Sequence, residues 1–168
     1  MSPFKRIILP ALVDLSVMPA GSSQAAEGSK FLAQALQDSL AEIEACELAL
    51  QKTSNDDVKA FSQHMIDQHS QMGQEIEKLA SKKNAILPKN VSSEQQSTYQ
   101  ELSKLSGKEF DRKFMQHNLE DHQKDIQVFQ QQAAQVSDAD IKAFAEQGVR
   151  LLGEHLKMAQ EVERKLPS

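Results

Sequence analysis

The hydrophobic positions along the chain recur every three or four residues in four long segments, which is the spacing of an amphipathic helix. These segments predict helices over residues 29–52, 56–83, 108–134 and 139–164. A shorter helical stretch over residues 93–105 lies in the long connection between the second and third of them. Each long helix carries an apolar stripe that it cannot bury alone. The chain is therefore expected to form an all-α four-helix bundle.

The two halves of the chain are related by an internal repeat. When the sequence is shifted by 83 positions, nine of the 31 residues from 31 to 61 are identical to their counterparts. The match resumes at His69 and His155, each of which begins the pattern His-x-x-Met-x-Gln-Glu. We therefore expect two related helical hairpins joined by the long helical connection. Ser54 and Ser137, each followed three residues later by an aspartate, predict capping boxes at the tight turn of each hairpin.

A polar residue of a metal-binding type interrupts the inward face of each long helix, close to its midpoint. In chain order these residues are Glu42, His69, His122 and His155. Because facing helices build metal sites in bundle cores, the four side chains are expected to meet at mid-bundle. Three imidazoles and a carboxylate suit one divalent Zn, Fe, Cu or Mn ion. Asp125, one helical turn after His122, is a further candidate ligand or an acceptor for the N–H group of a ligand.

The same histidines have a second interpretation as an ordinary polar core. A single histidine in an apolar stripe is more often a hydrogen-bonded core residue than a ligand, and three on separate helices leave both interpretations open. No Glu-x-x-His motif occurs, so the carboxylate-rich di-iron site of ferritins is not expected. His64 and His117 lie about 140° around the helix from His69 and His122, and are predicted to be surface residues, with an adventitious metal site as the alternative.

Composition and charge exclude three classes of protein. The 168 residues include 19 Lys and Arg against 24 Asp and Glu, a net charge of −5 that argues against a nucleic-acid-binding protein. The single cysteine, Cys46, cannot form an internal disulfide, which excludes a disulfide scaffold. No apolar run approaches the ~18 residues needed to span a bilayer, so no integral membrane span is expected.

The first 26 residues have the layout of a secretory signal peptide. Two basic residues precede an apolar run over residues 7–17, and a small-residue cleavage site follows at residues 23–25. Asp14 inside the run and the prolines Pro10 and Pro19 depart from this layout, and a disordered or surface-docked N-terminal arm is the alternative interpretation. We predict a signal peptide over residues 1–26, a bundle domain over residues 27–168, and a periplasmic or otherwise exported location in association with the envelope.

Short motifs run through the four long helices and the segment before the third one. They are Glu42-Ile43-Glu44, Val58-Lys59-Ala60-Phe61, Met65, His69-Ser70, Leu105-Ser106-Gly107, Phe110-Asp111, Asp121-His122, Phe129 and His155-Leu156. In combination they resemble a bacterial family catalogued as the domain of unknown function 4142 and often labelled an outer-membrane protein. The resemblance covers about residues 29–163, and implies a ferritin-like bundle exported from the cytoplasm without an established activity. Gln68 stands where the family usually has Asp, and Phe114 where it favours Tyr.

Together these observations predict an exported helical bundle that binds one divalent transition-metal ion through Glu42, His69, His122 and His155. Four protein ligands leave no open coordination position, so no catalytic residue is assigned. A metal-free structural or interaction module of the envelope or the stress response, whose polar core fixes helix register, is the alternative. A small metalloenzyme would need one of the four ligands to be absent or displaced by water. The partners to expect are an envelope protein or a second copy of the chain.

Overall fold

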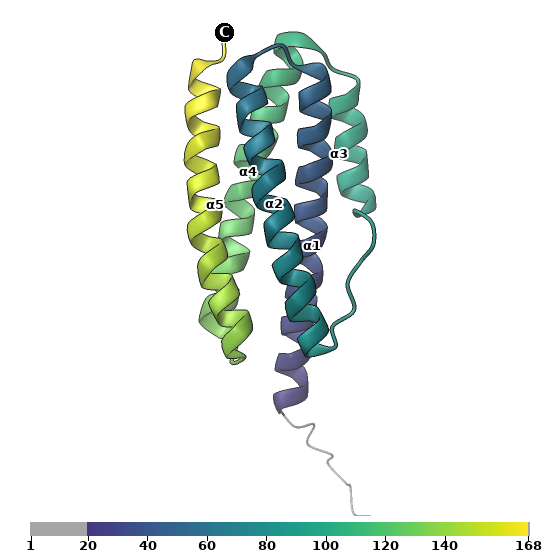
Figure 1. Ribbon diagram of the computed structural model, residues 1–168, viewed down its shortest axis with the longest axis vertical. Coiled ribbons are helices and arrows are strands. Elements are labelled where there is room, and N and C mark those ends of the chain that lie inside the picture. Colours follow the sequence, from purple (N-terminus) through teal and green to yellow (C-terminus); the bar gives the residue numbers. More distant parts are fainter. Residues whose placement is uncertain (1–19, 168) are drawn as a thin grey trace, which may run out of the picture.

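The computed structural model describes residues 20–167, and within that range the chain forms five α-helices and no strand (Figure 1). The helices are α1 (Ala20–Lys52), α2 (Asp56–Lys83), α3 (Ser93–Ser103), α4 (Gly107–Gln135) and α5 (Ala139–Lys165). The predicted all-α four-helix bundle is confirmed, with α3 as the short helix of the connection. None of the helices in the described range is both long and apolar enough to cross a membrane.

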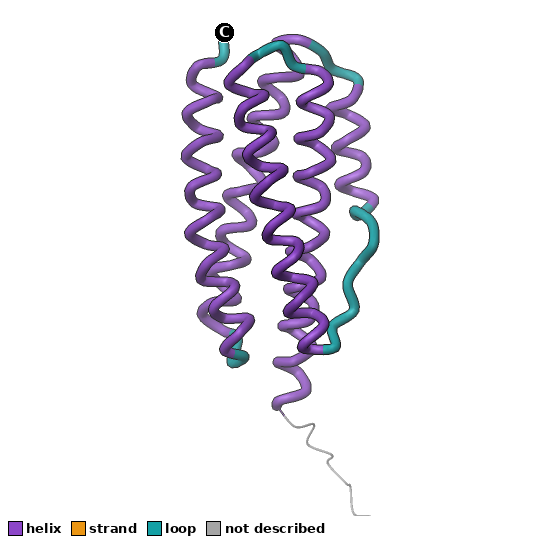
Figure 2. Tube along the Cα trace, viewed as in Figure 1, coloured by secondary structure: helices purple, strands orange, loops and turns teal. Residues whose placement is uncertain are grey.

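The four long helices form two antiparallel hairpins, as the internal repeat predicted. α1 packs along α2 and α4 packs along α5, while α1 also contacts α4 and α2 contacts α5. Figure 1 shows α1, α3 and α5 running in one direction and α2 and α4 in the other. The short α3 packs against α1 and α4 from outside, and the loop that leads to it follows the edge of the bundle (Figure 2). One face of the bundle is thus covered by a fifth helix.

The first helix begins earlier than the sequence predicted. α1 starts at Ala20, so it continues through the predicted cleavage site at residues 23–25. Residues 1–19, which hold the basic and apolar parts of the predicted signal peptide, lie outside the described residues. The division of the chain at residue 26 stays a prediction.

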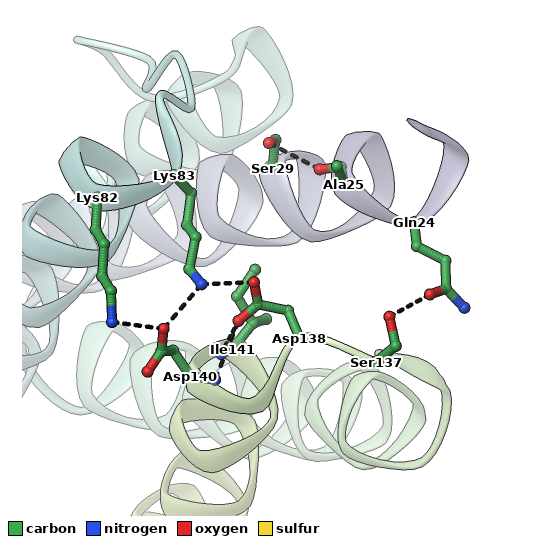
Figure 3. Close-up of polar contacts among 9 residues, drawn as sticks. All are labelled: Gln24, Ala25, Ser29, Lys82, Lys83, Ser137, Asp138, Asp140 and Ile141. Carbon is green, nitrogen blue, oxygen red and sulfur yellow. Dashed lines mark hydrogen bonds and ion pairs between the residues drawn. The ribbon is translucent and has the colours of Figure 1, made fainter. Parts of the chain in front are cut away.

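Side-chain caps begin the second helix of each hairpin, one residue later than predicted. Asn55 Oδ1 accepts hydrogen bonds from two backbone N–H groups in the first turn of α2, at 2.9 and 3.1 Å. Asp138 Oδ1 accepts two equivalent bonds at the start of α5, at 3.0 and 3.2 Å (Figure 3). The capping boxes predicted at Ser54 and Ser137 are therefore wrong, because the amide and the carboxylate one residue closer reach the free N–H groups. Asn55 and Asp138 are themselves equivalent in the repeat.

Ion pairs join the C-terminal end of α2 to the N-terminal end of α5 (Figure 3). Lys83 Nζ lies 2.5 Å from Asp138 Oδ2 and 2.8 Å from Asp140 Oδ2, and Lys82 Nζ lies 2.7 Å from Asp140 Oδ2. Hydrogen bonds from Lys82 and Lys83 lower the pKa of Asp140 to about 2. The lysines lie at the C-terminal end of α2, where the helix dipole is negative, and the aspartates lie at the N-terminal end of α5, where it is positive. Each charge therefore also interacts favourably with the dipole of its own helix. Pairs that are wholly or partly exposed to solvent add little to stability, and here they link one hairpin to the other.

The core consists of two hydrophobic clusters, one toward each end of the bundle. Each has three phenylalanines: Phe61, Phe110 and Phe114 in one, and Phe31, Phe129 and Phe144 in the other. Between the clusters, every long helix contributes at least one buried polar side chain. We call this set the polar band, and its members are Ser39 and Glu42 (α1), His69 (α2), Asn118 and His122 (α4) and His155 (α5). The fold therefore places the predicted metal ligands at one level of the bundle.

Replacing Gly148 by Ala is expected to destabilise the protein by about 1–3 kcal/mol, because the new methyl group would overpack the core. A Cβ atom at this position of α5 would collide with the ring of Phe129 on α4. That ring cannot move freely, since it packs edge-on against Phe31 with the ring centroids 4.9 Å apart. Thermal unfolding followed by circular dichroism measures the change.

Gly153, one turn and a half further along α5, provides the matched control. A Cβ atom there would meet nothing within 4 Å. Gly153→Ala is therefore expected to raise stability by up to about 1 kcal/mol, through the better helix propensity of alanine. Equal melting temperatures for the two variants would show that the α4–α5 approach at Gly148 is not tight.

Candidate metal centre

Three of the four predicted ligands face one another in the polar band. His69, His122 and His155 come from α2, α4 and α5, and their ring centroids are 5.3 to 5.7 Å apart. One nitrogen of each ring lies within 4.8 Å of the corresponding nitrogens of the other two. All three side chains are buried, with no more than 2% of their surface exposed. We call these residues the histidine cluster.

Hydrogen bonds orient two of the three rings. His122 Nδ1 lies 2.9 Å from the backbone carbonyl oxygen of Asn118, one turn earlier on α4. Because a carbonyl oxygen only accepts, this Nδ1 carries the proton, and the lone pair is on Nε2. His69 Nδ1 lies 3.5 Å from Ser39 Oγ, a longer contact to α1. Outer contacts of this kind set the tautomer and the ring orientation of metal-binding histidines.

Four imidazole nitrogens of the cluster have no hydrogen-bond partner in the protein. They are His69 Nε2, His122 Nε2, and both Nδ1 and Nε2 of His155. Burial lowers the pKa of His155 to about 3, lowers that of His122, and holds that of His69 well below its usual range. The three rings are therefore neutral at pH 7 and present lone pairs. Since an unpaired buried acceptor costs about 1–3 kcal/mol, this arrangement fits a group that accepts several nitrogen ligands.

Glu42, the fourth predicted ligand, belongs to a different set of side chains. Its side chain is 4% exposed, and one carboxylate oxygen lies within 4.8 Å of ligand atoms of His117 and Asp121 on α4. One of its carboxylate oxygens, Oε2, is buried without a hydrogen-bond partner. Burial, together with the charges of Asp121, Asp125 and other acids, raises the pKa of Glu42 well above its usual range. The structure thus brings together the three histidines, and groups Glu42 with His117 and Asp121.

Glu42 forms part of the wall of a groove between α1, α3 and α4 that has a volume of about 970 Å³. Its lining is rich in carboxylates, and we call it the acidic groove. The acidic residues that line it are Asp38, Glu42, Glu44, Glu94, Glu120, Asp121 and Asp125, against the lysines Lys30 and Lys124. Burial is the main cause that raises the pKa of Asp38 to about 6 and that of Asp125 to about 7. Asp125, a further candidate ligand from the sequence, therefore lines this groove with Glu42.

The chain matches, over residues 16–162, a protein family described as "Domain of unknown function (DUF4142)". The chain belongs to the DUF4142 family. The resemblance inferred from its motifs is thereby confirmed, and the matched range includes all four predicted ligands. No curated protein matches this DUF4142 chain in sequence.

The fold of this DUF4142 protein is similar to that of a solved structure described as a DUF305 fragment from Deinococcus radiodurans. The two share 14% sequence identity with a TM-score of 0.76, over 83% of this chain and 97% of the other. At this level of identity the likeness concerns the fold alone.

Two histidines predicted at the surface of this DUF4142 protein are half-buried beside the polar band. His117 Nε2 lies 3.3 Å from Asp121 Oδ2, and the ring of His64 stands edge-on to that of His155 at 5.8 Å. The surface prediction holds only in part, because both side chains keep some exposure while a position 140° from the apolar stripe still faces a neighbouring helix in a bundle. The spacing of His117 and Asp121, four residues apart on one helix face, was the available signal.

Replacing Asp125 by Asn is expected to stabilise the metal-free protein at pH 8, and much less at pH 5. The pKa of this carboxyl is raised from 3.8 to about 7, mainly by burial. Between pH 3.8 and about 7, the folded state binds the proton of Asp125 more tightly than the unfolded state does. The stability that the protonated carboxyl contributes is therefore lost as the pH rises through about 7. Asn cannot ionise and avoids this loss, which we expect to amount to about 1–3 kcal/mol.

Urea unfolding in the presence of a chelator, at both pH values, measures this difference. Asp67→Asn, at an exposed position of α2, is the control and should change stability little at either pH. A gain for Asp125→Asn that is the same at pH 5 and pH 8 would contradict the raised pKa.

Proposed function

We propose that this DUF4142 protein binds one divalent transition-metal ion, Zn, Fe, Cu or Mn, through the histidine cluster. The observation that carries the proposal is the convergence of His69, His122 and His155 with four ring nitrogens that lack a partner in the protein. Neutral imidazole is a good ligand for Zn, Cu and Fe ions. The lowered pKa values of the three rings support the proposal, because they keep the lone pairs free of protons across the physiological pH range.

Three protein ligands leave a further coordination position on the ion. Glu42 as the fourth ligand of this ion stays a prediction, since its carboxylate is grouped with His117 and Asp121. The proposal therefore rests on the three imidazoles. Their burial between two hydrophobic clusters supports a role in holding the ion rather than in processing a large substrate. The signal-like layout of the N-terminal residues supports a place of action outside the cytoplasm.

A metal-free bundle, in which the polar band only fixes the register of the helices, is the second candidate. The hydrogen bond from His122 Nδ1 to the Asn118 carbonyl favours it, because that bond orders the ring without an ion. The two candidates differ in their response to metal. A bound ion stabilises the folded state by about 2.7 kcal/mol when its free concentration is 100 times its Kd, whereas a metal-free module melts at the same temperature with ion or chelator.

Removing any one imidazole of the cluster is expected to weaken ion binding by ~100-fold or more, since loss of even an outer partner of a metal site costs about 10–100-fold. The purified protein is titrated with Zn²⁺ by calorimetry and with Co²⁺ by visible absorption. The wild type should bind one ion tightly, and His122→Ala and His155→Ala should lose that ion and its stabilising effect on thermal unfolding.

His64→Ala is the matched control for these variants. His64 is a half-buried histidine on α2 beside His155, but it does not belong to the cluster. The control should retain the tightly bound ion. Sub-stoichiometric binding by the wild type, or binding unchanged in His122→Ala and His155→Ala, would rule the proposal out in favour of the metal-free bundle.

A further inference from the structure

We infer that the acidic groove contains a second cation site, separate from the histidine cluster and formed by Glu42, His117 and Asp121. Two carboxylates and one imidazole favour a divalent cation that accepts mainly oxygen ligands, and Mn²⁺ is the cation that we assign to it. The site lies on the α3 side of the bundle, where α1 and α4 meet.

The geometry of the three side chains fits a single small cation. His117 and Asp121 are four residues apart on α4, with His117 Nε2 3.3 Å from Asp121 Oδ2. Glu42 approaches from α1, and one ligand atom from each residue lies within 4.8 Å of the other two. Atoms that each bond one ion at ~2.1 Å are at most about twice that distance apart. Small side-chain adjustments therefore bring all three donors onto one ion.

The buried carboxylate of Glu42 distinguishes this place from an ordinary acidic surface. Glu42 is 4% exposed, lines the groove, and has no hydrogen-bond partner for Oε2. Among the described residues, no lysine or arginine forms an ion pair with it. A carboxylate held in the protein without a compensating charge is costly. A cation in the groove supplies that charge and a partner for the carboxylate.

Asp121 has its two oxygens directed to different partners. Oδ1 lies 3.3 Å from Lys124 Nζ, and Oδ2 is the oxygen that faces His117. The lysine therefore occupies one side of the carboxylate and leaves the other for the ion. Exposed acids at the rim, such as Glu94 and Glu120, make the groove negative where it meets solvent and favour the entry of a cation.

The second site is adjacent to the histidine cluster but uses a different face of α4. Asp121 and His122 are consecutive, so their side chains point about 100° apart around the helix. His122 points into the polar band, while Asp121 lines the groove. One site offers nitrogen ligands in a closed core, and the other offers mainly oxygen ligands in an open groove. The two sites are thus expected to select different cations.

The test is a titration of the protein with Mn²⁺, with the free ion followed by electron paramagnetic resonance. The His155→Ala variant, whose histidine cluster is disabled, should bind one Mn²⁺, and the wild type should bind the same ion besides any Mn²⁺ that its histidine cluster holds. Glu42→Gln, Asp121→Asn and His117→Ala should each weaken that binding by ~10-fold or more. Glu47→Gln, the same change at an exposed position of α1, is the control and should leave it unchanged.

Each other outcome overturns the inference in a distinct way. Mn²⁺ binding that is insensitive to Glu42→Gln and Asp121→Asn would show adventitious binding to the acidic surface. Loss of Mn²⁺ in His155→Ala would place the ion in the histidine cluster. Loss of the tightly bound Zn²⁺ in Glu42→Gln would assign Glu42 to the cluster ion, as the sequence predicted. If Glu42→Gln does not fold, as judged by circular dichroism, the partly exposed Asp121 and His117 variants decide.

Discussion

The enclosure of three neutral imidazoles between two hydrophobic clusters is the constraint on which the rest of the structure depends. Aromatic packing at both ends of the bundle fixes the separation of the helices, and therefore fixes how closely the rings of His69, His122 and His155 approach one another. Four unpaired nitrogens in such a place lower the stability of the empty bundle. The surrounding clusters must offset this cost, and an ion that binds one nitrogen of each ring would remove most of it. Stability and binding are thus linked in the same few side chains.

The internal repeat explains why the polar side chains gather at one level. His69 and His155 are equivalent residues of the two hairpins, and His122 occupies the position equivalent to Ser39, which contacts His69. The groove follows the same pattern in part, because four of its seven acids form two equivalent pairs: Asp38 with Asp121, and Glu42 with Asp125. The short helix α3 breaks this symmetry, because it packs on the side of the bundle where α1 meets α4. A duplicated hairpin therefore produced a nearly symmetric core with one distinct face.

The elements and the inward-facing residues of this fold could be predicted from the sequence because helical periodicity is a local signal. The periodicity of residues 56–83 reproduces α2, and the gaps in the apolar stripes identify the three histidines that converge. The pairing of Glu42 with His117 could not be predicted in this way. It depends on how α1 and α4 are rotated relative to each other and on where α3 lies, and both are set by packing between distant segments. The helix caps differed from prediction for a simpler reason, since Asn55 and Asp138 compete with the neighbouring serines for the same N–H groups.

The histidine cluster and the acidic groove are coupled through charge, since Asp121 of the groove and His122 of the cluster are neighbours on α4. In the empty protein, burial, together with the repulsion between the carboxyls of the groove, holds the pKa values of Asp38, Glu42 and Asp125 high. A divalent ion in the histidine cluster would favour the ionised form of these acids, because an opposite charge nearby lowers a carboxyl pKa. The ionised groove would then attract a second cation more strongly than the protonated one, although the two ions repel each other. The negative charges of Glu42 and Asp121 at the groove site partly offset that repulsion, so occupation of the buried cluster does not exclude occupation of the open groove.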